Sequence, residues 1–485
     1  MNFKFSSSRV PETPYYTGCP ACMPMVEARK IGEEIRPPRR IEPDPDGINW
    51  NDQYWGYESW NRRKRRTIVR PLPRNITNRI PPELTDHIIH FLRWERKDLY
   101  NCALVCRAWH HWSQTLLYAV LSIEGWRSYN SVTRFTLPGK YSRRYLRFTR
   151  VLEIAPGKNK AYLPRSHAQR QYFQTIPCVL PLHGPMPNVQ CLHFFYCLYP
   201  PYHSSFVMSM ARFTELVHFT LIAFKFCSFA DLRRIICSLP KLRELELIEG
   251  TLSSASASVN VASPPECDYW PRLCSLTLAD LDLNLWATLS SWAASTNVCK
   301  SLTALHFSSV HIESTRLCSE HILEACGPSL AELSMHSSRG GLTNSLAYCT
   351  NLSNVSLNIR VDRIDSWQAV IAALHDTISQ FRSTCICYLK LSILLYSEGD
   401  LPSPYSDNEF QDINLRPIQE TIARPLFDSL KDVVIKVSAG YTTGYPRLTS
   451  DVVITAEEMK RRIRLILQPW DKRGILEVEC QHDEY

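Results

Sequence analysis

Two patterns of hydrophobic positions divide this chain. Between Ile80 and Trp112 the large apolar residues recur at the spacing of α-helices. The first predicted helix carries its apolar positions on one face: Leu84, Ile88, Phe91 and Leu92. Pro81 and Pro82 stand at its start, where the missing N–H of a proline would have no partner anyway. The pattern predicts three short helices in this stretch, of which this is the first.

The other two predicted helices follow directly. Asp98 is placed to cap the second helix. The apolar positions of the two helices are Leu99, Ala103 and Val105, and then Trp109, Trp112 and Leu116. Full burial of each large side chain is worth about 1.5 to 3 kcal/mol, and so short a unit cannot bury them all by itself. Either the rest of the chain or another protein must cover them.

These residues resemble an F-box. That family opens with Leu-Pro-x-Glu followed by Leu or Ile, passes an Asp-Leu pair and ends in Val-Cys-Arg-x-Trp. The matching positions are Pro81, Glu83, Leu84, Ile88, Leu92, Asp98, Leu99, Val105, Cys106, Arg107 and Trp109. Ile80 replaces the opening Leu, which is a conservative change. The expected extent of this F-box helical unit is residues 76–122, about a tenth of the chain.

The resemblance implies that this unit docks on a Skp-type adaptor, which joins F-box proteins to a cullin and so to ubiquitin transfer. The residues expected to contact the adaptor are Ile80, Pro81, Leu84, Ile88, Leu92, Leu99, Val105, Cys106 and Trp109. The alternative is an ordinary helical piece of a larger core, because Leu and Trp at helical spacing are common in cores.

The second pattern is a repeated Leu-x-x-Leu-x-Leu core, expected over residues 146–485. Its members are Val189/Leu192/Phe194, Leu216/Phe219/Leu221, Leu242/Leu245/Leu247, Leu273/Leu276/Leu278, Leu302/Leu305/Phe307, Leu330/Leu333/Met335 and Leu352/Val355/Leu357, with weaker members at Ile386/Leu389/Leu391 and Leu430/Val433/Ile435. Successive starts in the middle of the array lie about 22 to 31 residues apart, close to the period of leucine-rich repeats.

Amphipathic helices are predicted between these strands, at 229–240, 285–294, 315–326 and 367–381. One strand, loop and helix cannot bury its own apolar face, so neighbouring units must stack. The array resembles the leucine-rich repeats found behind the F-box in one class of F-box proteins, although the Asn or Cys that usually follows the strand is irregular here. The expected fold is α/β: a small three-helix F-box followed by a curved solenoid with a parallel inner sheet and outer helices.

A doubly wound single sheet would also alternate strands and helices, and it is the competing fold.

The chain is expected to close with a helix that covers the last repeat. Thr455 and Glu458 form a capping box for this helix, and Pro469 follows its apolar positions. Four basic residues are expected to face outward: Lys460, Arg461, Arg462 and Arg464. Residues 474–485 can add a final strand or a tail.

The strand pattern also predicts which residues line the concave face of the sheet, because alternate side chains of a strand point to opposite faces. The candidate substrate-binding residues on that face are His193, His218, Thr220, Glu244, Glu246, Thr277, His306, Glu332, His336 and Asn354. Such a surface suits recognition of a protein or peptide. A metal site at His193 and His218 is the weaker alternative, since no carboxylate is expected to complete a local cluster.

Composition narrows the functional classes. No run reaches the ~18 apolar residues that a membrane span needs, and Met1 to Tyr16 lacks a secretory core, so the 18 cysteines are expected as thiols in the cytosol or nucleus. Proline-dense residues 1–70 are expected to form a largely disordered tail. Within it, Cys19 and Cys22 lack the second half of a zinc site, and the basic run 62–66 fits nuclear import or simple solvation.

No phosphate-binding loop, nucleophile elbow or His-Glu-x-x-His motif is present, and no cofactor is expected. With no catalytic motif beside it, the resemblance to an F-box implies a non-catalytic, substrate-recruiting subunit of a Skp–cullin–F-box ubiquitin ligase that binds a target protein of unknown identity. The rival is a structural or scaffold protein that binds a partner through the repeats and never joins a ligase. Its basic region 134–170 could in addition meet nucleic acid, although no nucleic-acid recognition motif is found. An enzyme using Cys19 and Cys22 is a distant third.

Overall fold

The computed structural model describes residues 81–92, 95–124, 128–129, 131–132, 145–156, 186–200, 206–253, 271–310, 313–337, 345–362, 367–397, 410–441 and 456–481. The chain divides into two compact units at the boundary between Leu117 and Tyr118. We describe each unit by itself. The expected tail 1–70, with Cys19, Cys22 and the basic run 62–66, lies outside the described residues, as do most of the basic residues of 134–170.

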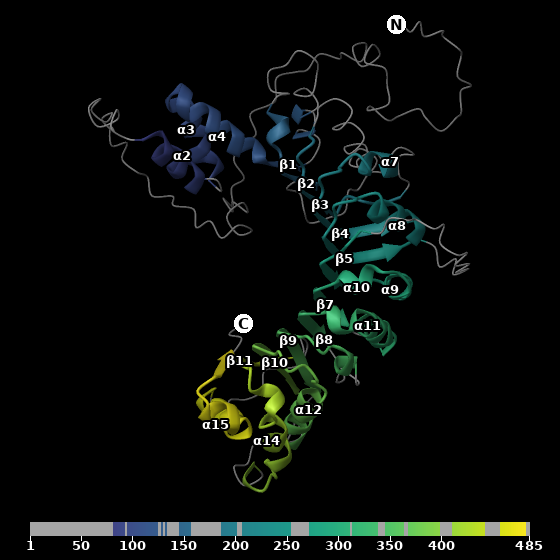
Figure 1. The fold of residues 1–485 in the computed structure, drawn as a ribbon, viewed down its shortest axis with the longest axis vertical. Coiled ribbons are helices and arrows are strands. Elements are labelled where there is room, and N and C mark those ends of the chain that lie inside the picture. The colour runs from purple at the N-terminus through teal and green to yellow at the C-terminus, as the bar shows by residue number, and fades with distance from the viewer. Residues whose placement is uncertain are drawn as a thin grey trace, which may run out of the picture. The chain divides into compact units, whose positions relative to one another are not determined.

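The first unit contains the three expected helices (Figure 1): α2 (Pro82–Phe91), α3 (Arg96–Val105) and α4 (Arg107–Ala119). Pro81 is the N-cap of α2, with φ −57° and ψ 141°, and Pro82 takes the first helical position, as the proline pair predicts. The predicted cap of α3 is wrong by one turn. Glu95 is the N-cap, and Asp98 lies in the first turn. Its negative charge there still interacts favourably with the positive end of the helix dipole.

The interior of this unit is small. Its fully or nearly fully buried apolar side chains are Ile89, Leu99, Cys102 and Ala103. The side chain of His110 in α4 reaches the carbonyl oxygen of Ala103 in α3, with 2.8 Å between Nδ1 and O, and this contact fastens the two helices together. Most other large apolar side chains of the unit are left on its surface.

Within the residues that the structure describes, the second unit is built on one sheet of twelve parallel strands whose spatial order follows the chain. The strands are β1 (Val120–Glu124), β2 (Val151–Ala155), β3 (Cys191–Phe195), β4 (His218–Phe226), β5 (Glu244–Leu252), β6 (Ser275–Ala279), β7 (Ala304–Val310), β8 (Glu332–Ser337), β9 (Asn354–Asp362), β10 (Tyr388–Ser397), β11 (Asp432–Tyr441) and β12 (Leu476–Gln481). Sequential order without a reversal rules out the doubly wound alternative, because that fold needs a switch point.

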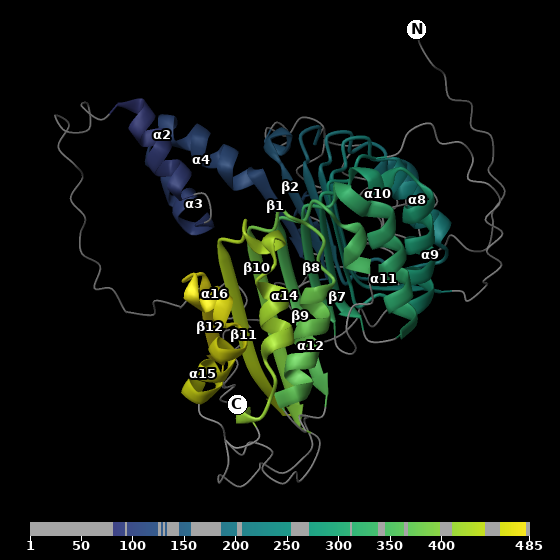
Figure 2. The same cartoon turned by 60° about the horizontal axis from the view of Figure 1, so that its bottom comes forward.

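The helices lie on one side of this sheet (Figures 1 and 2). They are α7 (Phe206–Met210), α8 (Phe229–Cys237), α9 (Leu283–Ser295), α10 (Val298–Ser301), α11 (Glu313–Cys326), α12 (Trp367–Ser379), α14 (Arg416–Ile422), α15 (Ala456–Ile466) and α16 (Gln468–Lys472). Short 3-10 turns occur at η2 (Leu146–Phe148), η3 (Gly327–Ser329), η4 (Ser345–Tyr348) and η5 (Pro425–Phe427). The expected α/β solenoid with an inner parallel sheet and outer helices is confirmed.

All nine predicted strand cores form strands, β3 to β11, and their Leu-x-x-Leu-x-Leu side chains make one continuous core. The sheet nevertheless starts earlier than residue 146, because Val120–Glu124 pairs in parallel with Val151–Ala155. The expected boundary is corrected accordingly: the end of the helical unit runs directly into β1. This short strand follows α4 without a turn signal, so its pattern alone does not mark it.

The position that usually holds Asn or Cys after the strand is filled differently in successive repeats. Cys197 fills it once and is buried, with its thiol 3.4 Å from the carbonyl oxygen of Ile154 in β2. In the next two repeats Phe224 and Gly250 stand there and are paired across β4 and β5. Buried apolar packing thus replaces the usual polar ladder, which explains the irregular sequence signal at this position.

The C-terminal cap is held by a buried cation. Helix α15 packs against β12, and the Arg462 side chain, only 1% exposed, lies over the rings of Trp367 in α12 and Phe410. The expectation that Arg462 faces outward is therefore wrong. The aromatic rings and the Glu458 carboxylate offset the free-energy cost of burying its charge. Thr455 of the expected capping box lies outside the described residues.

Among the helices described, none has the length and apolar character required to cross a membrane.

Candidate protein-docking sites

The first candidate site is the apolar surface of the three-helix unit. The exposed large hydrophobic side chains there are Leu84, Ile88, Phe91, Tyr100, Leu104, Val105 and Trp112. They are seven of the thirteen such side chains in the described part of the chain, although this unit is much smaller than the solenoid. Concentrated exposure of this kind marks an interaction surface more often than isolated exposed residues do.

Helical spacing gathers these side chains into stripes. On α2, Leu84, Ile88 and Phe91 recur at intervals of four and three residues and so share one face. The rings of His87 and Phe91 meet edge to face, with 4.8 Å between centroids. On α3, Tyr100 and Leu104 are four residues apart. The surface thus offers short apolar ridges with a partly polar border.

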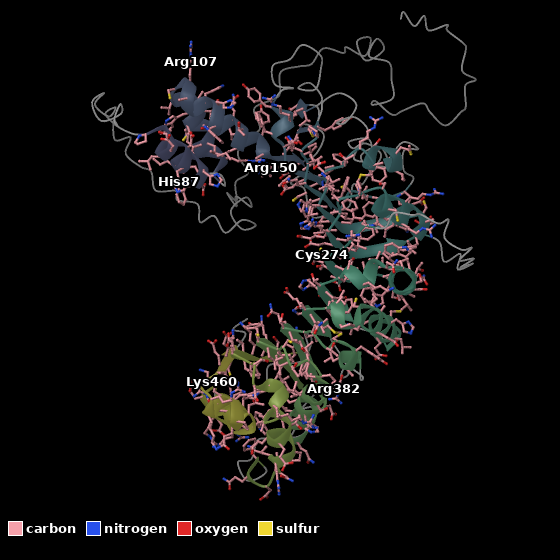
Figure 3. The ribbon with its side chains drawn as sticks, viewed as in Figure 1. His87, Arg107, Arg150, Cys274, Arg382 and Lys460 are labelled. Atoms are coloured by element: carbon pink, nitrogen blue, oxygen red, sulfur yellow. The ribbon has the colours of Figure 1, made fainter. Side chains whose placement is uncertain are left out.

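Charge borders this surface at the start of α4. Arg107 is exposed and projects away from the three helices (Figure 3). His87, on the opposite end of the sequence motif, is also exposed on α2. An apolar centre with a polar rim is the usual composition of a protein–protein interface.

The residues expected to contact an adaptor do not all lie on this surface. Pro81, Leu84, Ile88, Val105 and Cys106 are exposed, and Leu92 and Trp109 are half-buried. Leu99 is fully buried, so we assign it to the interior of the unit and not to the docking surface. Ile80 lies outside the described residues.

Sequence reasoning left four exposed residues out of this site. Phe91, Tyr100, Leu104 and Trp112 add apolar area to the surface. The intervals between Leu84, Ile88 and Phe91, and between Tyr100 and Leu104, were available as signals. Periodicity alone cannot tell an apolar face that packs inward from one that stays exposed.

The second candidate site is the sheet face opposite the helices. The predicted residues on it occupy the expected register: His193 pairs with Thr220, Thr220 with Glu246, Glu246 with Thr277, and Thr277 with His306, while His218 pairs with Glu244 and Glu332 with Asn354. His336 lies two residues along β8 from Ser334 and pairs with Asn358. Among these residues Thr220 is buried, and the others are partly or well exposed.

Five of these residues form one connected group, which we call the β3–β5 polar cluster: His193, His218, Thr220, Glu244 and Glu246. His218 Nδ1 lies 3.4 Å from Glu244 Oε2, and His218 Nε2 lies 3.5 Å from Glu246 Oε2. The Thr220 hydroxyl donates a hydrogen bond of 3.0 Å to Glu246 Oε2. The rings of His193 and His218 are 5.2 Å apart. The prediction that no carboxylate joins these histidines is wrong, because β5 lies directly beside β4.

The cluster shifts the acidities of its members. The hydrogen bond to Glu246 raises the pKa of His218 above its ordinary value, although burial acts the other way. The same hydrogen bond lowers the pKa of Glu246, helped by Thr220. Burial, and the neighbouring His218, lower the pKa of His193. His218 is therefore protonated more readily than His193.

Other chemistry finds little support in the described residues. Within the described ranges, no three His, Cys, Asp or Glu side chains are grouped to hold a metal ion. Cys299 and Cys326 contact each other in the buried core between repeats, and their contact lowers the pKa of Cys299 and raises that of Cys326. Cys349 in the next repeat is also buried, which raises its pKa to about 11. These thiols act as small core residues.

A partly exposed apolar column, whose residues the strand register places on the same concave face, runs beside the β3–β5 polar cluster. Phe195, Ile222 and Ile248 are in-register neighbours on β3, β4 and β5. Each is followed by a residue with positive φ: Tyr196 at 54°, Ala223 at 50° and Glu249 at 54°. These residues cost backbone strain of about 1 to 2 kcal/mol each, and they end the regular inner face at the same place in successive repeats. The column therefore forms one edge of the polar cluster.

Comparisons with known proteins give one family match, which covers the helical unit. Residues 77–123 match the family described as F-box-like. A comparison with curated proteins finds no match. Among chains of solved structure that match, an internalin (InlF) from Listeria monocytogenes str. 4b F2365 is 11% identical with a TM-score of 0.29, covering 76% of this chain and 86% of its own. The APL1 leucine-rich repeat domain is 10% identical with a TM-score of 0.22, covering 71% of this chain and 88% of its own.

Proposed function

We propose that this protein is the substrate-recruiting subunit of a Skp–cullin–F-box ubiquitin ligase. The observation that carries the proposal is the coincidence of the F-box-like match with the exposed apolar surface. The match spans residues 77–123, and the seven exposed hydrophobic side chains lie between Leu84 and Trp112. A Skp-type adaptor is the partner that this family implies for such a surface.

Burial supports the same assignment energetically. Each large side chain left on the helical unit would gain roughly 1.5 to 3 kcal/mol on full burial against a partner. Leu84, Phe91 and Leu104 are well exposed, so their gain is still available to an interface. The half-buried Trp109 would complete the covered area, since Trp is a frequent anchor in interfaces.

The solenoid would hold the protein to be ubiquitinated. Its parallel sheet presents partly exposed side chains from successive repeats on the face opposite the helices. The bond-forming steps would belong to the other subunits of the ligase, and this chain would contribute proximity between target and machinery. Stacked repeats suit that role because they build extended binding surfaces.

Co-purification with a Skp-type adaptor tests the adaptor half of the proposal. The test variant is Leu84→Asp, at a side chain that is 54% exposed on α2. The matched control is Leu317→Asp, the same substitution at a side chain 51% exposed on α11 of the solenoid. We expect the adaptor to be recovered with the wild type and the control but not with Leu84→Asp. Circular dichroism of each variant verifies that it is folded.

Two results would overturn the proposal. One is equal recovery of the adaptor with Leu84→Asp and with the wild type. The other is no recovery with the wild type. In the second case the rival scaffold function would be favoured, and the solenoid would act outside a ligase.

A further inference from the structure

The sheet face of β3 to β5 combines two features that recognise different parts of one ligand. The polar cluster supplies the carboxylates of Glu244 and Glu246. The apolar column supplies Phe195, Ile222 and Ile248. Glu246 and Ile248 are two residues apart on the same strand, so their side chains stand about 7 Å apart on one face.

We infer that this face binds an extended peptide segment of the target protein in which an Arg or Lys residue and a large apolar residue are two positions apart. The inference rests on the proposed recruiting function and names the chemistry of the recruited segment. The cationic group would lie between Glu244 and Glu246, and the apolar side chain would lie on the column at Ile222 and Ile248. In an extended peptide, side chains two residues apart lie on one face about 7 Å from each other, which matches the required separation.

Charge complementarity selects this occupant. In the described part of the chain, His218 forms ion pairs with both Glu244 and Glu246. His193 also belongs to the cluster, but burial and the neighbouring His218 lower its pKa, which favours its neutral form at neutral pH. While His193 is neutral, a single imidazolium at His218 balances at most one of the two carboxylates, so the cluster keeps a net negative charge. The carboxylates stay accessible, with Glu244 half exposed and Glu246 one-third exposed.

Another carboxylate on the same sheet does have a full cationic partner. On β11 and β12, Lys436 and Glu479 also face each other, 2.5 Å apart, and there the carboxylate has a full ammonium partner from its own chain. The β3–β5 polar cluster has no equivalent Lys or Arg among the residues that the structure describes. A ligand guanidinium or ammonium would supply the missing charge, and Arg could bind both carboxylates with its planar fork.

The experiment measures binding of the full-length chain to fluorescein-labelled degenerate octapeptides by anisotropy. Three mixtures serve as probes, each with two fixed residues at the centre separated by one random position: Arg-x-Leu, Glu-x-Leu and Arg-x-Ser. We expect the Arg-x-Leu mixture to bind more tightly than either of the others. Its binding should weaken as salt rises, because part of the attraction is between charges near the surface.

Variants locate the site. The Glu244→Gln, Glu246→Gln double variant should weaken binding of the Arg-x-Leu mixture about tenfold or more, and Ile248→Thr should weaken it while keeping a β-branched side chain in the strand. The charge-matched control is the double variant Glu420→Gln, Glu457→Gln, at exposed carboxylates of α14 and α15. It should bind as the wild type does.

Equal binding of the three mixtures, or unchanged binding by the Glu244→Gln, Glu246→Gln variant, would overturn the inference. Self-association of the chain in sedimentation that this variant abolishes would assign the face to a second copy and would also overturn it. The adaptor experiment is independent, since Leu84→Asp leaves the sheet unaltered. Adaptor recovery without peptide binding would reject this inference alone, and peptide binding without adaptor recovery would reject the ligase function alone.

Discussion

The ring of Phe224 fills the place that a side chain on Gly250 would occupy. The two residues are direct partners across β4 and β5. A Cβ built on Gly250 would lie 2.7 Å from Cε1 of Phe224 and 2.9 Å from Cδ2 of Leu285, closer than carbon atoms pack. The small residue in one repeat thus makes room for the large residue of the repeat before it.

The substitution Gly250→Ala should therefore destabilise the solenoid by roughly 1 to 3 kcal/mol through overpacking. The substitution Phe224→Ala by itself leaves a cavity. When Gly250→Ala is made in that variant, its methyl group has room, so the further loss of stability should be much smaller. The urea-unfolding midpoints of both single variants and the double variant measure this coupling. Gly327→Ala is a useful control, because a Cβ there meets nothing within 4 Å and only its φ of 47° opposes the change. Additive effects of the two substitutions would contradict the packing relationship.

Substitutions at Leu99 and at Leu84 should have different effects on the stability of the helical unit. Leu99 is fully buried, so Leu99→Ala should destabilise the helical unit by about 2 to 5 kcal/mol. Leu84 is exposed, and Leu84→Ala should change stability by less than about 0.5 kcal/mol. Hydrogen–deuterium exchange of peptides from α2 to α4 would report faster exchange for Leu99→Ala only. Similar exchange in the two variants would show that the unit does not have the interior described for it.

Arg462 should matter more than its neighbour Arg461, although both donate to the carboxylate of Glu458. Arg462 is 1% exposed and lies over the rings of Trp367 and Phe410, whereas Arg461 is 58% exposed. Arg462→Met should cost about 2 kcal/mol or more, because it removes cation–π contacts and a buried ion pair. Arg461→Met should be nearly neutral, as surface ion pairs usually are. Thermal unfolding of the two variants provides the comparison, and equal losses would rule out the buried anchor.

The same carboxylate predicts a dependence on pH. Hydrogen bonds from Arg461 and Arg462 lower the pKa of Glu458 to about 2. Because the folded pKa is below the ordinary value of 4.5, the stabilisation is present above that value and is lost as pH falls toward about 2. The wild type should thus lose stability between pH 5 and pH 2 more steeply than Glu458→Gln, measured as the melting temperature across this range. Parallel curves would contradict the ion pair.

His218 should titrate at a higher pH than His193. The Glu246 carboxylate raises the pKa of His218, while burial lowers the pKa of His193. The stabilisation from protonated His218 is fully present below its ordinary pKa of 6.5 and is lost as pH rises through the higher folded value. Imidazole NMR, with His218→Asn and His193→Asn spectra for assignment, measures both. Glu246→Gln should lower the pKa of His218, and Glu244→Gln should lower it less. A lower pKa for His218 than for His193 would refute the arrangement.

Much of the architecture can be predicted from the sequence because the signals are local. Apolar residues spaced four and three apart place α2, and the Leu-x-x-Leu-x-Leu cores place β3 to β11 and their inward-facing residues. The alternation of a strand fixes which side chains share a face, so the concave position of Glu246 and His218 follows without knowledge of the fold. The short strand β1 escapes this reasoning, since it follows helix α4 directly and no turn signal separates the two.

Contacts between repeats required the tertiary structure. The sequence by itself determined the three helices, the repeated strands and the face on which each strand residue lies, because these depend on local periodicity. Only stacking decided that Glu244 and Glu246 flank His218, that Phe224 covers Gly250 and that Arg462 is buried. It also decided that Leu99 packs inward while Leu84 stays exposed. The physical reason is that pairing across strands and helices depends on register and on the lengths of the connections, which side-chain periodicity does not encode.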